Sequence, residues 1–322
     1  DVINYESVHK VEGVYDLVIL DEAHHAISAI KKTSATWKKV YKKVKGLPII
    51  YLSATPYAET VGQLYNQFKL SQWTPFKGYK TYYEFHNFFG ISNKFKLHGR
   101  LIEKYDTFKL DMVLKQCDHL FSFKTRAEVG IAHEPQVNVV SVPLHPETLS
   151  KMKSWTDLQL VQFGEFMMEG DSDMKKRMVH YQMEGGTMKV SDYTSIILDH
   201  TEKVDYIKAN YEEKEIAVMA HFVKKRELLQ QALPEAIILS SDGDAEGVDL
   251  HRIGKLIVYS MSFKTSKHTQ RTARQANHNR DKPILVDILV SDTPAIGRAV
   301  YDAVAIKKEN FIKSSYERSI YG

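Results

Sequence analysis

The sequence predicts an α/β protein built on mainly parallel sheets. Short apolar runs rich in β-branched residues recur along the chain, as expected for strands that are buried on both faces. Longer segments separate these runs, and strands that alternate with helices favour parallel pairing. With 322 residues, 43% of them hydrophobic, the chain is long enough for two domains with separate cores.

The first clear strand is expected over residues 17–20, and the acidic pair Asp21 and Glu22 follows it directly. The residues around Asn4 are also expected to form a strand that leads toward this pair. Ligands of an open α/β sheet bind beyond the carboxyl ends of its strands. One carboxylate there can hold Mg²⁺ while the other orients or deprotonates a water, which suits phosphate chemistry. The alternative interpretation is an ordinary helix N-terminus, where acidic residues are favoured anyway.

An amphipathic helix is expected next, because apolar residues recur at the spacing of one helical face: Trp37, Val40, Tyr41 and Val44. Lysines line the other face of this helix: Lys38, Lys39, Lys42 and Lys43. We favour a solvated face that covers a sheet. The alternative is a contact with nucleic-acid phosphates that does not depend on base sequence.

A second strand is expected over residues 47–52, and it leads into Ser53 and Thr55. Residues 65–89 are then dense in aromatic side chains. Stacking on unpaired bases would use such residues. Packing against the first domain would use them too, and we favour packing.

We place the domain boundary between residues 135 and 136, where Pro135 interrupts the chain before a strand over residues 137–142. Residues 151–190 are expected to form a methionine-rich helical insertion with a flexible loop at Gly185 and Gly186. Four further strands are expected in the second domain, over residues 216–220, 237–240, 256–259 and 284–290.

Four short motifs in a fixed order give the chain a family resemblance: Asp21-Glu22-Ala23-His24, Ser53-Ala54-Thr55, Ala245-Glu246-Gly247-Val248-Asp249-Leu250, and Gln270-Arg271-Thr272-Ala273-Arg274 with Arg280 beyond. This order resembles motifs II, III, V and VI of the superfamily 2 helicases and translocases. The residues of motif II resemble the DEAH box, and the sequence around the motifs is similar to that of Swi/Snf-type and phage-encoded helicases. The resemblance implies two RecA-like lobes, with ATP between them and nucleic acid across both.

The resemblance also implies roles for the residues of the first lobe. Asp21 would hold Mg²⁺ through water, Glu22 would be the catalytic base, and His24 would bridge to motif III or to the second lobe. Ser53 and Thr55 would couple the nucleotide state to nucleic-acid binding by relaying a hydrogen bond. The expected cofactors are therefore ATP and Mg²⁺.

In the second lobe the resemblance implies that Gly247 allows close backbone approach and that Asp249 faces the nucleotide or the cleft. Ser241 stands where relatives contact the nucleic-acid backbone. Gln270 begins the motif VI pattern, which resembles the arginine-finger segment of relatives.

Two arginines are candidates for the finger. Arg274 matches the pattern, but Asn277 stands where relatives commonly carry a second arginine. Arg280 could replace that arginine and is our preferred candidate. The six residues that separate Arg274 from Arg280 would place them on different sides of a regular helix.

The sequence contains no phosphate-binding loop of the form G-x-x-x-x-G-K-[ST]. We therefore expect the first lobe to be incomplete, with a missing N-terminal part needed to complete the ATP site. A DNA helicase or translocase is the favoured interpretation. The alternatives are a translocase that remodels complexes without separating strands, and a nucleic-acid-binding module that does not hydrolyse ATP.

The composition agrees with a nucleic-acid partner, and the resemblance implies DNA more than RNA. The net charge is +4, a mildly basic balance. The single cysteine, Cys117, excludes an internal disulfide and a cysteine zinc cluster, and it fits a reducing cytosol. No apolar run approaches the roughly 18 residues that a membrane span requires, so we expect no membrane partner.

Overall fold

The computed structural model divides into a first unit, Asp1–Phe123, and a second unit, Lys124–Gly322. The described residues are 1–27, 29–53, 56–57, 60–97, 100–124, 128, 130, 135–170, 172–241, 250, 252–263, 282–292 and 296–306. This division lies before the boundary at 135/136 that the sequence suggested. Within the described residues, no helix combines the length and apolar character needed to cross a bilayer.

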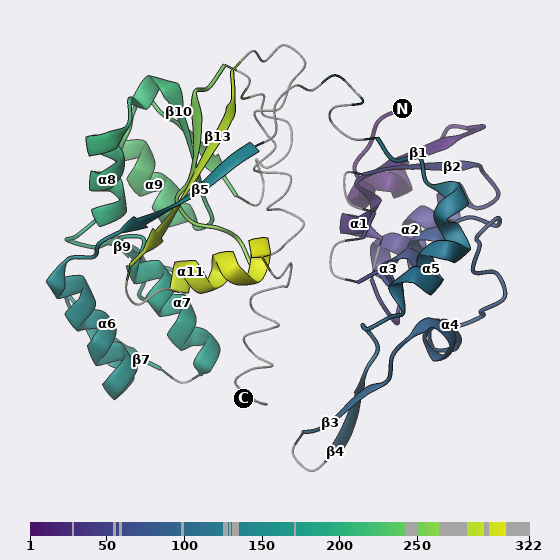
Figure 1. Cartoon of the computed structure of the whole chain (residues 1–322), viewed down its shortest axis with the longest axis horizontal. Helices are drawn as coiled ribbons and strands as arrows, with labels where there is room; N and C mark the ends of the chain where they lie inside the picture. The colour runs from purple at the N-terminus through teal and green to yellow at the C-terminus, as the bar shows by residue number, and fades with distance from the viewer. Residues whose placement is uncertain are drawn as a thin grey trace. The chain divides into compact units, whose positions relative to one another are not determined.

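The first unit is organised around two parallel strands. Its early elements are η1 (Tyr5–Lys10), β1 (Val18–Asp21), α1 (Ala23–Ala26), α2 (Ala35–Val44) and β2 (Ile49–Leu52). β1 pairs with β2 in parallel, from Val18 opposite Ile49 to Asp21 opposite Leu52 (Figure 1). The strand expected around Asn4 is wrong, because the Asn4 side chain accepts a hydrogen bond from the Ser7 amide at 2.9 Å and caps the 3₁₀ turn η1.

The predicted amphipathic helix is confirmed as α2. Ser34 caps it by accepting a hydrogen bond from the Trp37 amide at 3.0 Å. Trp37, Val40 and Val44 are buried against the first-unit core, while the lysines of the opposite face are exposed. The lysine face is therefore open to solvent, and a contact with nucleic-acid phosphates there stays a prediction.

The rest of the first unit packs on aromatic side chains. Its later elements are α3 (Gln63–Phe68), α4 (Tyr82–Phe89), β3 (Asn93–Leu97), β4 (Arg100–Lys104), α5 (Leu110–Cys117) and η2 (Asp118–Leu120). Six of the aromatics in residues 65–89 are buried in one cluster: Tyr65, Phe68, Phe76, Tyr82, Phe85 and Phe89. Packing is therefore the main role of this segment. Trp73, Tyr83 and Phe88 remain exposed.

The second unit contains a five-stranded sheet in which every neighbouring pair is parallel, in the order β11-β10-β12-β13-β5. Its strands are β5 (Pro135–Val142), β10 (Ile216–Ala220), β11 (Ile237–Ser240), β12 (Lys255–Val258) and β13 (Ile284–Ser291). They match the five strands expected there to within two residues at each end. The predicted α/β class with mainly parallel sheets is confirmed.

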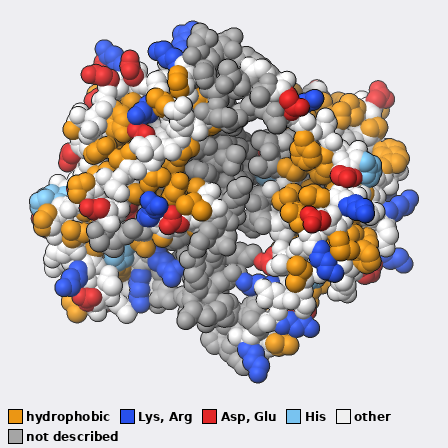
Figure 2. Space-filling model, in the orientation of Figure 1, with side chains coloured by type: hydrophobic (Ala, Val, Ile, Leu, Met, Phe, Trp, Pro, Cys, Tyr) orange, Lys and Arg blue, Asp and Glu red, His pale blue; other side chains and the backbone are white. Residues whose placement is uncertain are grey.

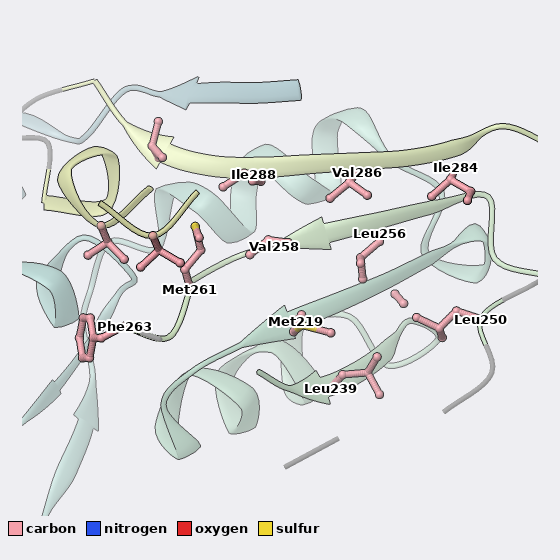
Figure 3. Packing of buried hydrophobic residues seen from close by; sticks show 14 of the residues in the cluster. Met219, Leu239, Leu250, Leu256, Val258, Met261, Phe263, Ile284, Val286 and Ile288 are labelled. Carbon is pink, nitrogen blue, oxygen red and sulfur yellow. The ribbon is translucent and has the colours of Figure 1, made fainter. Parts of the chain in front are cut away.

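Helices cover both faces of this sheet, which explains why its central strands β10, β12 and β13 are mostly apolar, whereas β5 at its edge carries exposed polar residues. The helical elements are α6 (Pro146–Leu158), α7 (Asp173–Met183), α8 (Glu202–Asn210), η4 (Glu213–Glu215), α9 (Val223–Ala232), α11 (Ile296–Tyr301) and the π-type turn η5 (Asp302–Ile306). Along β10, Met219 points into the cluster that includes residues of α7 and α11, whereas Val218 joins the cluster with α8 and α9. Figure 3 shows the first of these clusters along the strands.

The methionine-rich insertion is only partly helical, which corrects the sequence interpretation. α6 and α7 are present, but an antiparallel hairpin, β6 (Leu160–Phe163) with β7 (Phe166–Glu169), lies between them. Gly164 adopts a φ of +59° in the two-residue turn of this hairpin, a conformation that favours glycine. A second small hairpin, β8 (Thr187–Lys189) with β9 (Ser195–Ile197), follows α7.

Candidate active site

The acidic motif and the Ser53 segment meet at the carboxyl ends of β1 and β2. Asp21 is the last residue of β1 and lies opposite Leu52, the last residue of β2. The Glu22 amide continues the ladder by donating to the Leu52 carbonyl at 2.8 Å. Because parallel strands end at the same edge, side chains 31 residues apart in sequence become neighbours here.

Glu22 has an unusual backbone conformation. Its φ and ψ are 46° and 41°, in the left-handed region that non-glycine residues rarely adopt. Such a residue costs on the order of 1–3 kcal/mol and persists where its surroundings enforce it, often at functional sites. Here the strand ladder holds one side of Glu22, and the α1 helix begins immediately after it. The turn aims the Glu22 side chain toward the end of β2.

Three side chains form a compact hydrogen-bonded cluster at this edge, which we call the strand-end cluster: Glu22, His24 and Ser53. The Ser53 hydroxyl donates to Glu22 Oε2 at 3.0 Å and lies 2.8 Å from His24 Nδ1. His24 Nδ1 is also 3.2 Å from Glu22 Oε2. Since the hydroxyl proton of Ser53 points to Glu22, the network is satisfied when His24 Nδ1 carries a proton and donates it.

The members of the strand-end cluster differ in exposure. The His24 side chain is fully buried, whereas the Glu22 side chain is 25% exposed. A buried histidine therefore fixes one end of the network, and the carboxylate of Glu22 stands at the solvent boundary. This arrangement can offer a carboxylate to a water while a serine and a histidine hold its orientation.

Asp21 has a different environment from Glu22. The Tyr5 hydroxyl donates to the Asp21 backbone carbonyl at 2.6 Å. Burial, together with the negative charges of Asp21 and Glu22, raises the pKa of Tyr5, which keeps it a neutral donor. The Asp21 side chain itself is exposed. An exposed carboxylate at a strand end fits a Mg²⁺ ion held through its water shell.

An apolar cavity of about 670 Å³ borders the strand-end cluster within the first unit. It is lined in part by Ser53, Pro56, Trp73, Phe121 and Phe123. Its volume lies within the range of about 300–1,000 Å³ typical of ligand pockets. The sequence offered no signal for this cavity, because its walls come from segments that are separated by up to 100 residues.

The second-lobe residues implied by the resemblance fall mostly outside the described part of the chain. These residues are Gly247, Asp249, Gln270, Arg274 and Arg280. Thr55, expected in the first lobe, also lies outside the described residues. Their roles, and the choice of arginine finger, stay predictions.

Ser241 is the one expected second-lobe residue that is described. It follows β11 directly, and its amide donates to the Ala220 carbonyl at 3.0 Å. The residue is fully buried, and among the described residues its hydroxyl has no hydrogen-bond partner. A nucleic-acid contact at Ser241 stays a prediction, and it requires that this hydroxyl become accessible.

The second unit contains a charged cluster that the sequence did not reveal, centred on Glu184 and Lys203. Glu184 accepts hydrogen bonds from Lys203 Nζ at 2.9 Å, from the Ser291 amide at 2.9 Å and from the Gly297 amide at 2.8 Å. Lys203 also donates to the Leu289 carbonyl at 3.0 Å. Burial alone would raise the pKa of Glu184, but Lys203 and the two amides outweigh it and lower the pKa.

Lys225 lies next to this pair and is buried almost completely. Its ammonium nitrogen donates to the Tyr181 carbonyl at 2.7 Å, and burial followed by repulsion from Lys203 moves its pKa well below the usual value. No charge pattern in the sequence marks these residues, since they lie on separate helices in stretches that look like ordinary amphipathic segments.

Comparison with known proteins agrees with the resemblance carried by the motifs. Residues 2–58 match the helicase-family domain described as "Type III restriction enzyme, res subunit". This segment contains β1, the acidic motif and Ser53. The resemblance to superfamily 2 helicases and translocases is thereby confirmed for this segment. No curated protein matches the chain.

Two solved structures are similar to the chain at 14% sequence identity. The C-terminal part of the Fun30 ATPase domain covers 38% of this chain with a TM-score of 0.32, and the chain spans 54% of its length. The SWI2/SNF2 ATPase core of Sulfolobus solfataricus in complex with dsDNA covers 97% of this chain, which covers 72% of it, with a TM-score of 0.36. At these scores the description of the fold rests on the strand topology given above.

Proposed function

We propose that this chain forms part of an ATP-dependent superfamily 2 motor that moves on nucleic acid, with DNA preferred over RNA. The observation that carries the proposal is the strand-end cluster. It places a strained, partly exposed Glu22 beside His24 and Ser53, at the edge of a parallel sheet where phosphate ligands bind. The family match over residues 2–58 supports the same reading.

In this proposal Glu22 orients and deprotonates the water that attacks the terminal phosphate. Asp21 holds Mg²⁺ through water, and the ion when bound would neutralise charge on the phosphates. When Glu22 turns toward the water, the Ser53 hydroxyl loses its acceptor on Glu22 but keeps His24 within 2.8 Å. The hydrogen bonds of Ser53 and His24 would therefore change with the state of the nucleotide site and would couple that state to nucleic-acid binding.

We further propose that nucleic acid is held through its backbone. The net charge of +4 and the exposed lysine face of α2 are compatible with phosphate contacts. On the face drawn in Figure 2, the lysine and arginine side chains of the described residues are dispersed rather than gathered in one patch. We therefore expect binding that weakens with salt and depends little on base sequence.

The proposal is tested by measuring ATP hydrolysis and movement in a protein that combines this chain with a phosphate-binding loop. Hydrolysis that rises when DNA is added is the expected result. Strand separation would identify a helicase, whereas displacement of a bound protein without strand separation would identify a remodelling translocase. DNA-independent hydrolysis, or none in the combined protein, would contradict the motor.

The second candidate is a nucleic-acid-binding module that does not hydrolyse ATP, and it is favoured by the lack of a phosphate-loop pattern in these 322 residues. The same lack leads us to expect that the chain alone hydrolyses ATP very weakly or not at all. Measuring nucleotide binding by the chain separates the two candidates, because a binding module without a nucleotide site would retain DNA but no ATP.

A further inference from the structure

Three side chains on the second unit, two from the start of α6 and one more than 50 residues further along the chain, converge at one point on its surface: His145, Glu147 and His200. His145 caps α6, Glu147 is the second residue of that helix, and His200 lies between β9 and α8 (Figure 1). One ligand atom from each of the three lies within 4.8 Å of the others. We propose that these residues bind a divalent transition-metal ion, Zn²⁺ or Ni²⁺ in class, a role that is separate from the motor.

The donor set selects the kind of metal. Two imidazole nitrogens and one carboxylate oxygen suit Zn²⁺ and neighbouring transition metals, whereas Mg²⁺ and Ca²⁺ prefer oxygen ligands alone. Three protein ligands leave a fourth position of a tetrahedral ion for water. The three ligands would therefore form a site that is open to a fourth ligand. Its preferred metal differs from the Mg²⁺ that we propose at Asp21.

The separations are close to those a metal requires. Ligand atoms about 2.1 Å from a tetrahedral ion lie about 3.4 Å from one another. His200 Nε2 is already 3.0 Å from Glu147 Oε2. His145 and Glu147 are exposed. An ion would replace the hydrogen bond between His200 and Glu147, and a shift of the His145 ring would give up its 3.3 Å hydrogen bond from the Glu147 amide.

The two imidazole rings provide a second argument. They stack with centroids 3.7 Å apart and planes inclined by 19°. This contact holds the two rings together, and each neutral imidazole offers one nitrogen lone pair to a metal. A bound ion would require one nitrogen of each ring to face it, and a change in the tilt of the stacked rings would allow this.

Carboxylates around the site offset the positive ends of the two helices that begin there. Glu147 Oε2 lies toward His200 and is the ligand atom that the carboxylate offers to the site. Lys151 contacts the other oxygen, Oε1, at 3.0 Å and leaves Oε2 to the site. Glu202 accepts from the His145 amide at 2.7 Å, and among the described residues its Oε2 is buried without a hydrogen-bond partner.

The same contacts make the site rigid at its base. Glu202 Oε1 accepts from both the His145 amide and the Thr148 hydroxyl, each at 2.7 Å. The start of α6 is thereby tied to the start of α8, and His200 lies two residues before Glu202. The metal would add a third link between these helix ends, so binding should also raise the thermal stability of the second unit.

Calorimetric titration of the untagged chain with ZnCl₂ tests the proposal. We expect one tight site that His145→Ala and His200→Ala each weaken by at least about tenfold, as expected when one of three ligands is lost. His119→Ala is the matched control, because His119 is an exposed histidine beside Asp118 in the first unit, and it should leave the tight site unchanged. Excess Mg²⁺ should not compete.

A conservative variant guards against loss of folding in the alanine variants. His200→Gln keeps a side-chain amide that can donate to Glu147 but removes the nitrogen lone pair. It should retain the melting temperature of the metal-free chain and lose the rise in melting temperature on adding Zn²⁺. Unchanged Zn²⁺ affinity in both the His200→Gln and His145→Ala variants, or no tight site in the unaltered chain, would overturn the proposal.

Discussion

The strand-end cluster of the first unit and the Glu184–Lys203 pair of the second unit both surround a carboxylate beside parallel strands, but their environments differ. Glu184 is buried, has an ordinary backbone conformation and accepts three hydrogen bonds. Glu22 has a left-handed backbone and a side chain that is 25% exposed. Its hydrogen bond from Ser53 is shared with a neighbouring histidine.

This difference fits a structural carboxylate at Glu184 and the reactive carboxylate that we propose at Glu22. Every contact of Glu184 would have to break for its side chain to move, and each loss leaves a buried polar group unpaired. Glu22 can turn toward solvent while Ser53 keeps a partner in His24. Four experiments, given in order of expected effect, test the difference between the two carboxylates.

The largest effect is expected for Glu22→Gln in an ATPase-competent protein that contains this chain. The amide preserves the shape of the side chain but cannot accept a proton from water. Turnover should fall by about 10²–10⁴-fold, the usual contribution of a general base, with nucleotide affinity retained. Steady-state ATPase rates and nucleotide binding measure the two quantities. A variant with near-normal turnover would remove Glu22 from the base role.

The next effect concerns the stability of the second unit. Lys203→Met leaves Glu184 charged, buried and without its ion-pair partner, and should lower the free energy of unfolding by about 3–5 kcal/mol. Urea unfolding followed by circular dichroism measures this change. Lys214→Met, which breaks the exposed pair with Glu235 at 3.2 Å, is the matched control and should change little. Equal effects of the two variants would show that the buried pair is not structural.

A smaller effect is expected from acid. The pKa of Glu184 is lowered in the folded chain, so its stabilising contribution is complete above the unfolded value of about 4.3 and is lost as the pH falls through the folded pKa. Comparing the urea midpoints of the unaltered chain and Glu184→Gln from pH 6 to pH 3 isolates this group. The difference should be constant at the upper end and shrink below about pH 4. A constant difference throughout would contradict the lowered pKa.

The smallest effect is expected for Ser53→Ala. The substitution removes the hydrogen bond from Ser53 to Glu22 and the 2.8 Å contact between Ser53 and His24, but it leaves His24 within 3.2 Å of the carboxylate. A single such bond is worth about 0.5–1.5 kcal/mol, so turnover should fall by about tenfold or less. Stimulation by DNA should fall further than basal turnover if Ser53 relays the nucleotide state. Equal loss of basal and stimulated rates would reduce Ser53 to a positioning role at Glu22.

Patterns that act over a few neighbouring residues were recovered well from the sequence. The strands β10, β11 and β13 and the helix α2 were located because burial on both faces, or on one helical face, leaves an apolar period in the chain. The 3₁₀ turn at Asn4 and the hairpin at Gly164 were missed. In both cases one residue, a capping side chain or a glycine with positive φ, outweighs the surrounding propensity.

The amino-acid sequence was sufficient to predict the α/β class, the parallel strands of the second unit and the position of Asp21 and Glu22 at a strand end. These follow from local periodicity, which each segment carries independently of the others. Three contacts became visible only in the folded chain: Ser53 with Glu22 and His24, Lys203 with Glu184, and His200 with His145. Those contacts depend on strand register and helix packing across tens of residues, and no local pattern encodes such distances.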